Sequence, residues 1–426
     1  MEPGIIIVPI SKTVAKPGMR KGAKAEQAAR TKARIADAVV TVLAEAGSSR
    51  LTHRLVAAAA GVSLAATTYH YATKHDMVAD ASKRLLDDYV RSFQRAARRQ
   101  SRGGGAADLA TFVTRLLTNA MGRHRRLALA WCEIILEAAR SAEGHALADE
   151  WFGKLFEAWR DLAGVMYGGL SDDSIMSGID TAIGLLFITL PLELTPDQLA
   201  AVFLRGGDPA HLWAPVPVEP LAGPAVQVRP TPKARETRAR ILQGAIDVLI
   251  AQGAGAVTYK AVAAESGLTI AAPAYHFGSI DGLLKAAEAE MFARSKDRYR
   301  DMATSAVGNG APLDTLADLT AAVFVREVSQ HGRAAIAIYS IGLESSRRVE
   351  LRPAVWKVVA DQAAAWKRRL EHLYPRVAPF DAMRMQAVFI GKQVRVLATG
   401  SQMAQLAQVR AAFRGEIAAA STSASD

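Results

Sequence analysis

Apolar residues recur every three or four positions along most of the chain, which is the spacing of amphipathic helices. The segment 29–46 shows this spacing clearly, at Ile35, Val39, Val42, Leu43 and Ala46. Residues 149–162 repeat it with the bulky side chains Trp151, Phe152, Leu155, Phe156 and Trp159. Runs of β-branched residues, which favour strands, are few. The pattern therefore predicts an all-α protein.

Short helices follow the first amphipathic stripe. Gly47 ends the first helix, and Thr52 is a suitable N-cap for a helix over 53–60. Gly61 then provides a turn, and Ser63 caps a third helix that continues through Tyr71. Two short helices joined by a glycine turn are typical of a helix-turn-helix.

This stretch occurs twice. Val56–Ser63, followed by Tyr69–Tyr71, returns as Val262–Thr269, followed by Tyr275–Phe277, at a constant offset of 206 residues. The later parts match more weakly at an offset of 207, as the following pairs show: Leu136-Glu137 with Leu343-Glu344, Trp159 with Trp366, and Gln198–Ala200 with Gln405–Ala407. We infer that a small N-terminal module and a larger helical module are each present in two copies.

Composition shifts set the expected boundaries. The first copy comprises a basic disordered arm at 1–28, a helix-turn-helix domain at 29–80 and a helical domain at 81–206. A proline-rich linker at 207–233 acts as a semi-rigid spacer. The second copy has a helix-turn-helix domain at 234–286, a helical domain at 287–415 and a frayed tail at 416–426. Glycine-containing loops at 100–106 and 308–312 mark a hinge or break within each helical domain.

Charge points to a polyanionic partner. The 426 residues carry a formal net charge of +11, which suits nucleic acid or an anionic membrane, although a solubilising surface also produces it. The longest apolar run, 181–190, is shorter than the roughly 20 residues that span a bilayer. Glu2 stands where a signal peptide needs positive charge. We expect a soluble cytoplasmic protein that does not engage a membrane.

Enzymatic signatures are missing from the sequence. It contains no phosphate-binding glycine loop after a strand, no His-Glu-x-x-His and no nucleophile elbow. Cys132 is the single cysteine and lies in an apolar stretch, so a small buried hydrophobe is the favoured interpretation. We therefore predict no catalytic residues, no metal ligands and no cofactor.

A helix-turn-helix places specific demands on its residues. A small alanine lets the two helices approach, a glycine makes the turn, and an N-cap starts the second helix, whose first turn faces the major groove. Ala57, Gly61 and Ser63 meet these demands in the first copy. Ala263, Gly267 and Thr269 meet them in the second.

The module resembles the TetR family of bacterial repressors. That family's pattern runs Ile-Ala-x-x-Ala-Gly-Val-Ser, then Tyr-x-x-Phe, then Ser-Lys and a leucine. In the first copy, its places are taken by Val56–Ser63, Tyr71, Thr73-Lys74 and Met77, and in the second by Val262–Thr269, Phe277, Ser279-Ile280 and Leu283. The resemblance implies all-helical subunits that dimerise through a C-terminal bundle, which also holds a small-molecule inducer. It therefore implies a pseudo-dimer within this one chain.

The resemblance and the helix-turn-helix pattern give a set of expected DNA contacts. In the first copy they are Thr52, His53, Arg54, Ser63, Leu64, Ala65, Thr67, Thr68, Tyr69, His70 and Lys74. In the second they are Thr258, Tyr259, Lys260, Thr269, Ile270, Ala271, Ala274, Tyr275 and His276. For Tyr71 and Phe277 we expect packing instead.

The two copies depart from the family pattern in different ways. The family's first recognition-helix tyrosine falls on Thr68 and Ala274, so the neighbouring Tyr69 and Tyr275 take over its work. The lysine that contacts phosphate in the family is kept as Lys74 but becomes Ile280, and Pro273 lies inside the second recognition helix. We infer that the second copy binds DNA less strongly or reads a different half-site.

The C-terminal domains offer candidate inducer contacts, namely Trp131, Glu137, Trp159, Glu344 and Trp366. At helical spacing the tryptophans are more often core, and a buried glutamate is more often paired with an arginine. The sequence thus predicts a ligand-released repressor that binds double-stranded DNA as a single-chain pseudo-dimer, with further dimerisation left open. The alternative is a helical ligand- or protein-binding scaffold whose helix-turn-helices no longer bind DNA.

Overall fold

The computed structural model describes residues 17–103, 108–209, 231–305, 312–401 and 408–420, and all of its regular elements are helical, as the sequence predicts. The first half of the chain forms α1 (Pro17–Ala46), η1 (Ser48–Arg50), α2 (His53–Ala60), α3 (Leu64–His70), α4 (Lys74–Ser101), α5 (Leu109–Met121), α6 (Arg125–Ala138), α7 (Ala142–Tyr167), α8 (Asp172–Leu192) and α9 (Pro196–Phe203).

The second half follows the same order. It forms α10 (Pro232–Gln252), η3 (Ala254–Ala256), α11 (Tyr259–Ser266), α12 (Ala271–Phe277), α13 (Ile280–Ser305), α14 (Pro312–Glu344), η4 (Val349–Leu351), α15 (Arg352–Glu371), α16 (Pro379–Thr399) and α18 (Val409–Ala419). Both α2 and α11 span eight residues at an offset of 206, and α8 and α16 span 21 residues at an offset of 207. We call residues at these offsets paired positions, with 206 applying through α13 and 207 from α14 onward.

One helix of the second half replaces two of the first. The long helix α14 covers the positions paired with both α5 and α6. In the first half Gly122 ends α5, and the chain turns before α6 begins. The position paired with Gly122 is Ser329, which lies within α14. Because serine costs a helix interior less than glycine does, the second half continues where the first breaks.

Three boundaries differ from the sequence predictions. Helix α1 begins at Pro17 rather than near Ala29, since the alanine, lysine and glutamate of this stretch are good helix formers. Thr269 does not cap the second recognition helix, whose N-cap is Ile270 without a side-chain bond. Helix α18 continues to Ala419, into the expected tail.

Some sequence predictions concern residues outside the described ranges. They are the arm at 1–16, the linker at 210–230, most of the two glycine loops at 104–107 and 306–311, the repeat Gln405–Ala407 and the tail at 421–426.

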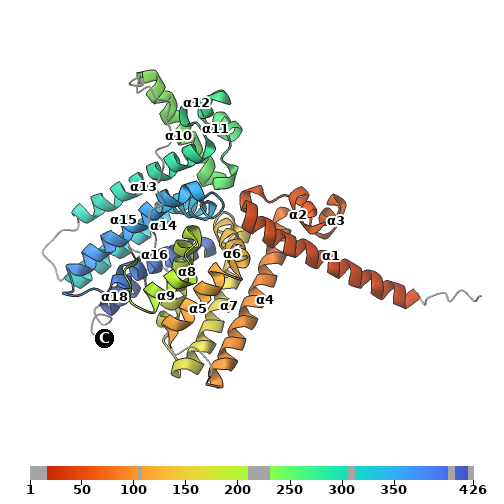
Figure 1. Cartoon of the computed structure of the whole chain (residues 1–426), viewed down its shortest axis with the longest axis horizontal. Coiled ribbons are helices and arrows are strands. Elements are labelled where there is room, and N and C mark those ends of the chain that lie inside the picture. Colours follow the sequence, from red (N-terminus) through yellow and green to blue (C-terminus); the bar gives the residue numbers. More distant parts are fainter. Residues whose placement is uncertain (1–16, 104–107, 210–230, 306–311, 402–407, 421–426) are drawn as a thin grey trace, which may run out of the picture.

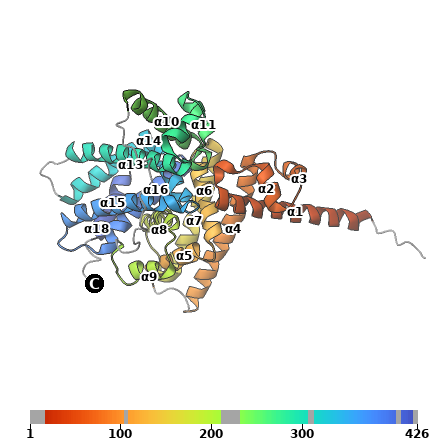
Figure 2. The same ribbon diagram turned by 45° about the horizontal axis from the view of Figure 1, so that its top comes forward.

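The helix-turn-helix groups project from a shared helical body. Figure 1 shows α1–α3 and α10–α12 on neighbouring sides of the molecule, and the turned view in Figure 2 keeps this arrangement. The largest core cluster joins the halves, because it combines residues of the first half with Ile336, Leu343, Met383 and Val394. The second helix-turn-helix and the outer part of the second half have separate clusters.

The halves meet where α8 crosses α16. A Cβ built on Gly184 would lie 1.8 Å from the carbonyl oxygen of Ala387, and one on Gly391 would lie 1.8 Å from that of Asp180. Gly184 and Gly391 are paired positions, and so are Asp180 and Ala387. The two contacts are therefore reciprocal, as in a two-fold interface between identical subunits. Only glycine permits such close approach of the two backbones.

A buried charge cluster adds asymmetry to this crossing. Asp180 is fully buried and accepts hydrogen bonds from Lys392 at 2.9 Å and from Arg395 at 2.7 Å. Burial alone raises the pKa of Asp180, but the two cations together hold it below its ordinary value. The paired positions of the two cations, Leu185 and Ile188, are apolar. The cluster therefore distinguishes the two halves and fixes the register of α8 against α16.

Burial explains the strong apolar character of α8. Among the described residues it is the one helix long and apolar enough to cross a bilayer, yet 78% of its most apolar window is buried inside the protein. It packs against α16, and also against α7, α14 and α15. Apolarity on every side is what a helix at the centre of a bundle needs.

We predict that Gly391→Ala destabilises the protein although alanine favours helix. The new methyl group must push α8 away, which costs about 1–3 kcal/mol and outweighs the gain of up to about 1 kcal/mol in helix propensity. Urea unfolding followed by circular dichroism measures the effect. Gly153→Ala is the matched control, because a Cβ there meets nothing within 4 Å. The control should gain stability; equal gains in both variants would contradict the crossing.

Candidate nucleic-acid interface

The first helix-turn-helix is built from α1, α2 and α3. Gly61 ends α2 in the left-handed conformation with φ 62°, and Val62 donates its amide to the carbonyl of Ala57. Arg34 of α1 reaches across and donates to the carbonyls of Ala60 at 2.6 Å and Gly61 at 3.1 Å. The turn is thus closed by glycine and capped by an arginine, which sets the angle of the next helix.

Helix α3 presents an outward face. Tyr69 is 84% exposed and Leu64 is 51% exposed, both unusual for large apolar side chains. Ser63 caps the helix by accepting from the amide of Ala66 at 3.1 Å. Of the predicted contacts in the first copy, the exposed ones are Thr52, Arg54, Ser63, Leu64, Ala65, Thr68 and Tyr69, while His53, His70 and Lys74 are partly exposed.

Thr67 corrects the sequence prediction. It is fully buried, and its hydroxyl donates to the carbonyl of Leu64 at 2.8 Å. It faces the helix-turn-helix core and cannot reach a ligand outside. Its paired position, Pro273, is buried as well. These two positions therefore do not distinguish the outer faces of the two recognition helices.

The second helix-turn-helix repeats the geometry with local changes. Gly267 has φ 63°, and Arg240, paired with Arg34, donates to the carbonyl of Ser266 at 2.8 Å. Tyr275 is 86% exposed and Ile270 is 60% exposed. The other exposed predicted contacts are Thr258, Lys260, Thr269 and Ala271, and the partly exposed ones are Tyr259, Ala274 and His276.

Pro273 is accommodated because α12 starts late. The helix begins at Ala271, so Pro273 is its third residue. The first amides of a helix have no partner within it, and the missing N–H of proline costs little there. The phenol of Tyr259 also donates to the carbonyl of Gly278 at 3.1 Å, which ties the start of α11 to the end of α12.

Packing at Tyr71 and Phe277 is confirmed. Tyr71 is buried and donates to Asp80 at 2.7 Å; its burial and this bond raise the pKa of the phenol. Phe277 packs on the second core cluster, with the guanidinium of Arg238 3.9 Å from its ring centre. Each ring ties the end of its recognition helix to the first helix of its group, since Lys32 of α1 lies over Tyr71 and Arg238 of α10 lies over Phe277.

Lys74 has a partner within the protein. Its ammonium lies 3.2 Å from Glu137 of α6, which also pairs with Arg140 at 3.5 Å. The first helix-turn-helix is therefore linked to its helical domain by charge. In the second half Ile280 takes the lysine's place, and the neighbouring Asp281 pairs with Arg348 instead.

Each half caps the first helix of the other. Arg347, just beyond α14, donates to the carbonyls of Leu43 and Ala44 at the end of α1, both at 2.9 Å. Its paired residue Arg140 donates to the carbonyl of Ile250 near the end of α10 at 2.9 Å. Ala44 and Ile250 are themselves paired positions. A cation at a helix C-terminus satisfies free carbonyls and opposes the helix dipole.

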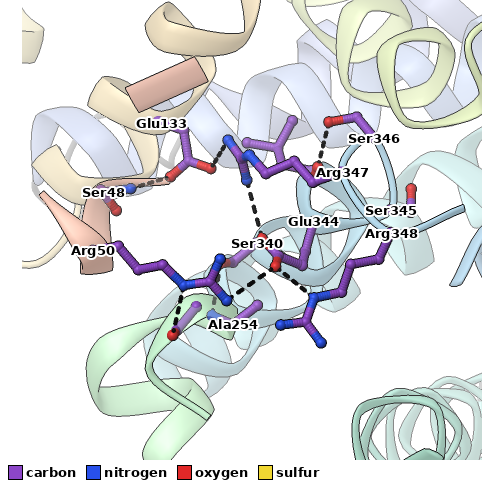
Figure 3. A network of polar contacts seen from close by, with 12 residues as sticks. Ser48, Arg50, Glu133, Ala254, Ser340, Glu344, Ser345, Ser346, Arg347 and Arg348 are labelled. Atoms are coloured by element: carbon purple, nitrogen blue, oxygen red, sulfur yellow. Dashed lines mark hydrogen bonds and ion pairs between the residues drawn. The ribbon is translucent and has the colours of Figure 1, made fainter. Parts of the chain in front are cut away.

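A second pair of contacts holds the turn after each of these helices. Ser48 donates its amide to Glu133 at 3.0 Å, and its paired residue Ala254 donates to Ser340, paired with Glu133, at 3.2 Å. Glu133 in turn accepts from Arg347 at 2.8 Å (Figure 3). The position of one helix-turn-helix therefore depends on residues of both halves.

The two helix-turn-helix groups also touch directly. Arg50 of η1 donates to the carbonyl of Gly255 in η3 at 3.3 Å and lies 3.6 Å from Glu344 (Figure 3). A Cβ on Gly255 would lie 2.4 Å from the hydroxyl of Ser49, its paired residue. The groups thus form one assembly rather than two independent heads.

The candidate inducer contacts lie in three different environments: ion pairs, a packed aromatic core and a cavity. Glu137 and Glu344 are held by cations, and Glu344 pairs with Arg50, Arg347 and Arg348. Trp131 and Trp159 are buried among aromatic rings of the first half. Trp366 lines a cavity of about 440 Å³ in the second half. Cys132 is fully buried, and burial raises the pKa of its thiol.

Sequence reasoning missed Arg140 and Arg347. The signal was present, because both lie three residues after the glutamates of the repeated Leu-Glu pair. Two arginines kept at paired positions indicate a shared role, but the sequence does not show that each one crosses to the opposite half.

We predict that Arg347→Gln lowers the free energy of unfolding by about 3 kcal/mol, because it leaves buried Glu133 and Glu344 without their shared cation. Chemical denaturation measures this. Arg91→Gln, which breaks the exposed pair with Asp88, is the control and should change stability by no more than about 0.5 kcal/mol. If both variants lost the same free energy of unfolding, the buried ion pairs of Arg347 would stabilise the protein no more than an exposed pair does.

Comparison with known proteins gives a family match in the second helix-turn-helix. Residues 241–287 match the family model described as "Bacterial regulatory proteins, tetR family". This range includes most of α10, all of α11 and α12, and the start of α13. Among curated proteins, none matches the chain.

Two solved structures of multidrug binding protein EbrR are similar to part of the chain. The complex with imidazole shares 24% identity, covers 42% of this chain and 93% of that one, and has a TM-score of 0.33. The complex with malachite green shares 22% identity, covers 42% and 96%, and has a TM-score of 0.34. The family match supports the resemblance in the second half: residues 241–287 carry a tetR-type regulatory domain.

Proposed function

We propose that the chain is a sequence-specific transcriptional regulator, in which two tandem TetR-like subunits act as a single-chain pseudo-dimer. One observation carries the proposal: two exposed recognition helices belong to groups that are tied together by reciprocal contacts between the halves. A homodimer reaches such an arrangement through symmetry, whereas here paired residues of one chain supply it.

Exposed phenols support a role in binding DNA. Tyr69 and Tyr275 project from paired positions and each lies against the following histidine, with ring centres 5.2 Å apart. A tyrosine held by a neighbour loses little entropy when its hydroxyl donates to a phosphate. The surrounding charge of the chain is positive, so binding should weaken steeply as salt rises.

The two recognition faces differ chemically. The first carries Leu64 and Thr68 at positions where the second carries Ile270 and Ala274. Threonine can bond to a base edge, whereas alanine can only pack against a thymine methyl group. The two halves of a single chain can differ in sequence, unlike the subunits of a homodimer, so we propose an operator with unequal half-sites.

Helix α14 offers a route from a ligand to both helix-turn-helix groups. It lines the second-half cavity from Leu316 to Tyr339. Ser340, the next residue of α14 after Tyr339, accepts a hydrogen bond from Ala254 of η3. Arg347, which lies beyond the end of α14, donates a hydrogen bond to the carbonyl of Leu43 in α1. A ligand that shifts α14 would move both contacts together and release the DNA, which is the behaviour of a ligand-released repressor.

We predict unequal protection of the operator. Footprinting on the DNA upstream of the coding region should reveal two half-sites roughly one helical turn apart, with the sequence under α3 differing from that under α12. A perfect palindrome with equal protection of both arms would contradict the proposal.

The alternative function is a helical scaffold that binds a ligand or a protein but no longer binds DNA. The losses at Ile280 and Ala274 motivate it. The two functions differ in what the exposed tyrosines do, since a scaffold has no use for them at a DNA surface.

We expect Tyr69→Ala to weaken DNA binding at least tenfold, and Tyr275→Ala to weaken it less, because the second copy lacks the lysine at position 280. Gel shifts at two salt concentrations measure both. Tyr167→Ala, which changes an exposed residue at the end of α7, is the control and should have no effect. No shift by the native chain at low salt would favour the scaffold.

A further inference from the structure

The second-half cavity lies between α13, α14, α15 and α16. It has a volume of about 440 Å³, within the range of sites for drug-sized molecules. Its walls include the apolar side chains of Phe292, Ile338 and Trp366. They also include Gln362, Gln386 and Gln393, which is an unusual number of amides for the inside of a helical bundle.

The first half provides a comparison within the same chain. At the positions paired with the three glutamines it carries Leu155, Ile179 and Leu186. All three are buried in its core. The fold therefore does not require polar side chains at these positions. Burying an amide costs free energy unless it finds a partner, so the glutamines indicate a purpose other than stability.

Large rings fill the corresponding space in the first half. Trp131 takes the position paired with Ile338, Trp151 that paired with Val358, and Tyr89 that paired with Ser295. These rings contact one another, with Tyr89 5.7 Å from Trp151 and Trp131 5.7 Å from Trp151 between centroids. Rings of the first half thus occupy the space that is hollow in the second, and the first half keeps a smaller pocket of about 290 Å³ between α4 and α7, beside Trp151.

Among the described residues, one buried polar atom of the cavity lining has no hydrogen-bond partner. Gln386 donates to Gln362 at 2.8 Å, but its own Oε1 is buried without a partner in the protein. Gln393 accepts from Tyr339 at 2.5 Å. Glu327 is bound by Arg298 through two bonds of 2.9 and 3.0 Å, so its charge is matched. The Oε1 atom of Gln386 therefore remains free to accept a hydrogen bond from a ligand.

We propose that the chain has one ligand site, in the second half only, for an uncharged and largely apolar ring compound that donates an O–H or N–H to Gln386. The apolar walls hold the ring system, and the unpaired oxygen selects for the donor. Charged side chains also line the cavity, but Lys296 pairs with Asp361 at 3.8 Å, Glu327 pairs with Arg298, Arg369 lies over the ring of Trp366, and Arg368 is exposed. A charged ligand would lose its hydration and find no counter-ion at the buried oxygen of Gln386.

A single site suits the connection to the rest of the chain. Helix α14 is continuous from the cavity to the contacts with both helix-turn-helix groups, whereas the paired helices α5 and α6 are broken. One ligand beside α14 thus acts on both groups. This regulatory meaning rests on the proposed function, but the binding itself does not.

The test uses three probes with the native chain in the absence of DNA. These are 2-naphthol, 2-methoxynaphthalene and 2-naphthoate, whose binding is measured by calorimetry. We expect 2-naphthol to bind roughly tenfold more tightly than the methoxy compound, which cannot donate, and 2-naphthoate to bind most weakly. Equal binding of 2-naphthol and 2-methoxynaphthalene, or tightest binding of the carboxylate, would overturn the proposed ligand class.

Substitutions then locate the site. Ile338→Trp copies Trp131 into the second half and should abolish binding of all three probes. Gln386→Ile copies Ile179 and should remove the preference for 2-naphthol while keeping the chain folded. Gln330→Ile, on an exposed face of α14, is the matched control and should bind as the native chain does. If Ile338→Trp does not fold, Ser295→Tyr, which copies Tyr89 at a position that lines the cavity, replaces it.

Two outcomes remain distinct. Binding that persists in folded Ile338→Trp or Ser295→Tyr would refute a site in the second half. If the probes bind as expected but the chain fails to shift DNA, the ligand site stands and the proposed regulatory function fails.

Discussion

The close crossing of α8 and α16 determines where every other part of the chain lies. Two glycines at paired positions let the backbones touch, and the reciprocal contacts of Gly184 and Gly391 impose a local two-fold relation. Once that relation is set, Arg140 and Arg347 meet the ends of α10 and α1 in the opposite half. The arrangement of the two recognition helices is therefore a consequence of packing at the centre of the bundle.

Departures from symmetry are concentrated at three places. Asp180 binds two cations that have no counterpart in the first half. The helix pair α5 and α6 becomes one helix, α14, and the aromatic filling around Trp131 becomes a cavity. Each change affects the second half, which also has Ile280 where the first half has Lys74. Under the proposed function, the two halves would divide the work, with the first better suited to DNA and the second to a ligand.

The sequence predicted the helical fold and both helix-turn-helix motifs because local signals determine them. Thr52, Gly61 and Ser63 act through the backbone beside them, so their spacing is sufficient. Thr67 was placed on the wrong face, since a short polar side chain gives no hint of burial when it can bond to its own helix. The crossing glycines and the exchanged arginine caps could not be predicted, because their partners lie more than 100 residues away.

The cavity was beyond sequence reasoning for a related reason. The tryptophans stood out in the sequence, but four of the five in the described helical domains pack in the main core, and only Trp366 lines the cavity. The informative residues were the glutamines, which become meaningful only beside Leu155, Ile179 and Leu186 at paired positions. An internal comparison of the two halves would have found them.

The central claim is that contacts between the halves hold the two recognition helices in a fixed relation. Spin labels at Ala65→Cys and Ala271→Cys, which are exposed paired positions, measure it directly by pulsed electron resonance, and the native Cys132 is buried. The account predicts one narrow distance distribution in the free chain, which broadens when Arg140 and Arg347 are both changed to glutamine. A broad distribution in the native chain, or no change in the double variant, would contradict it.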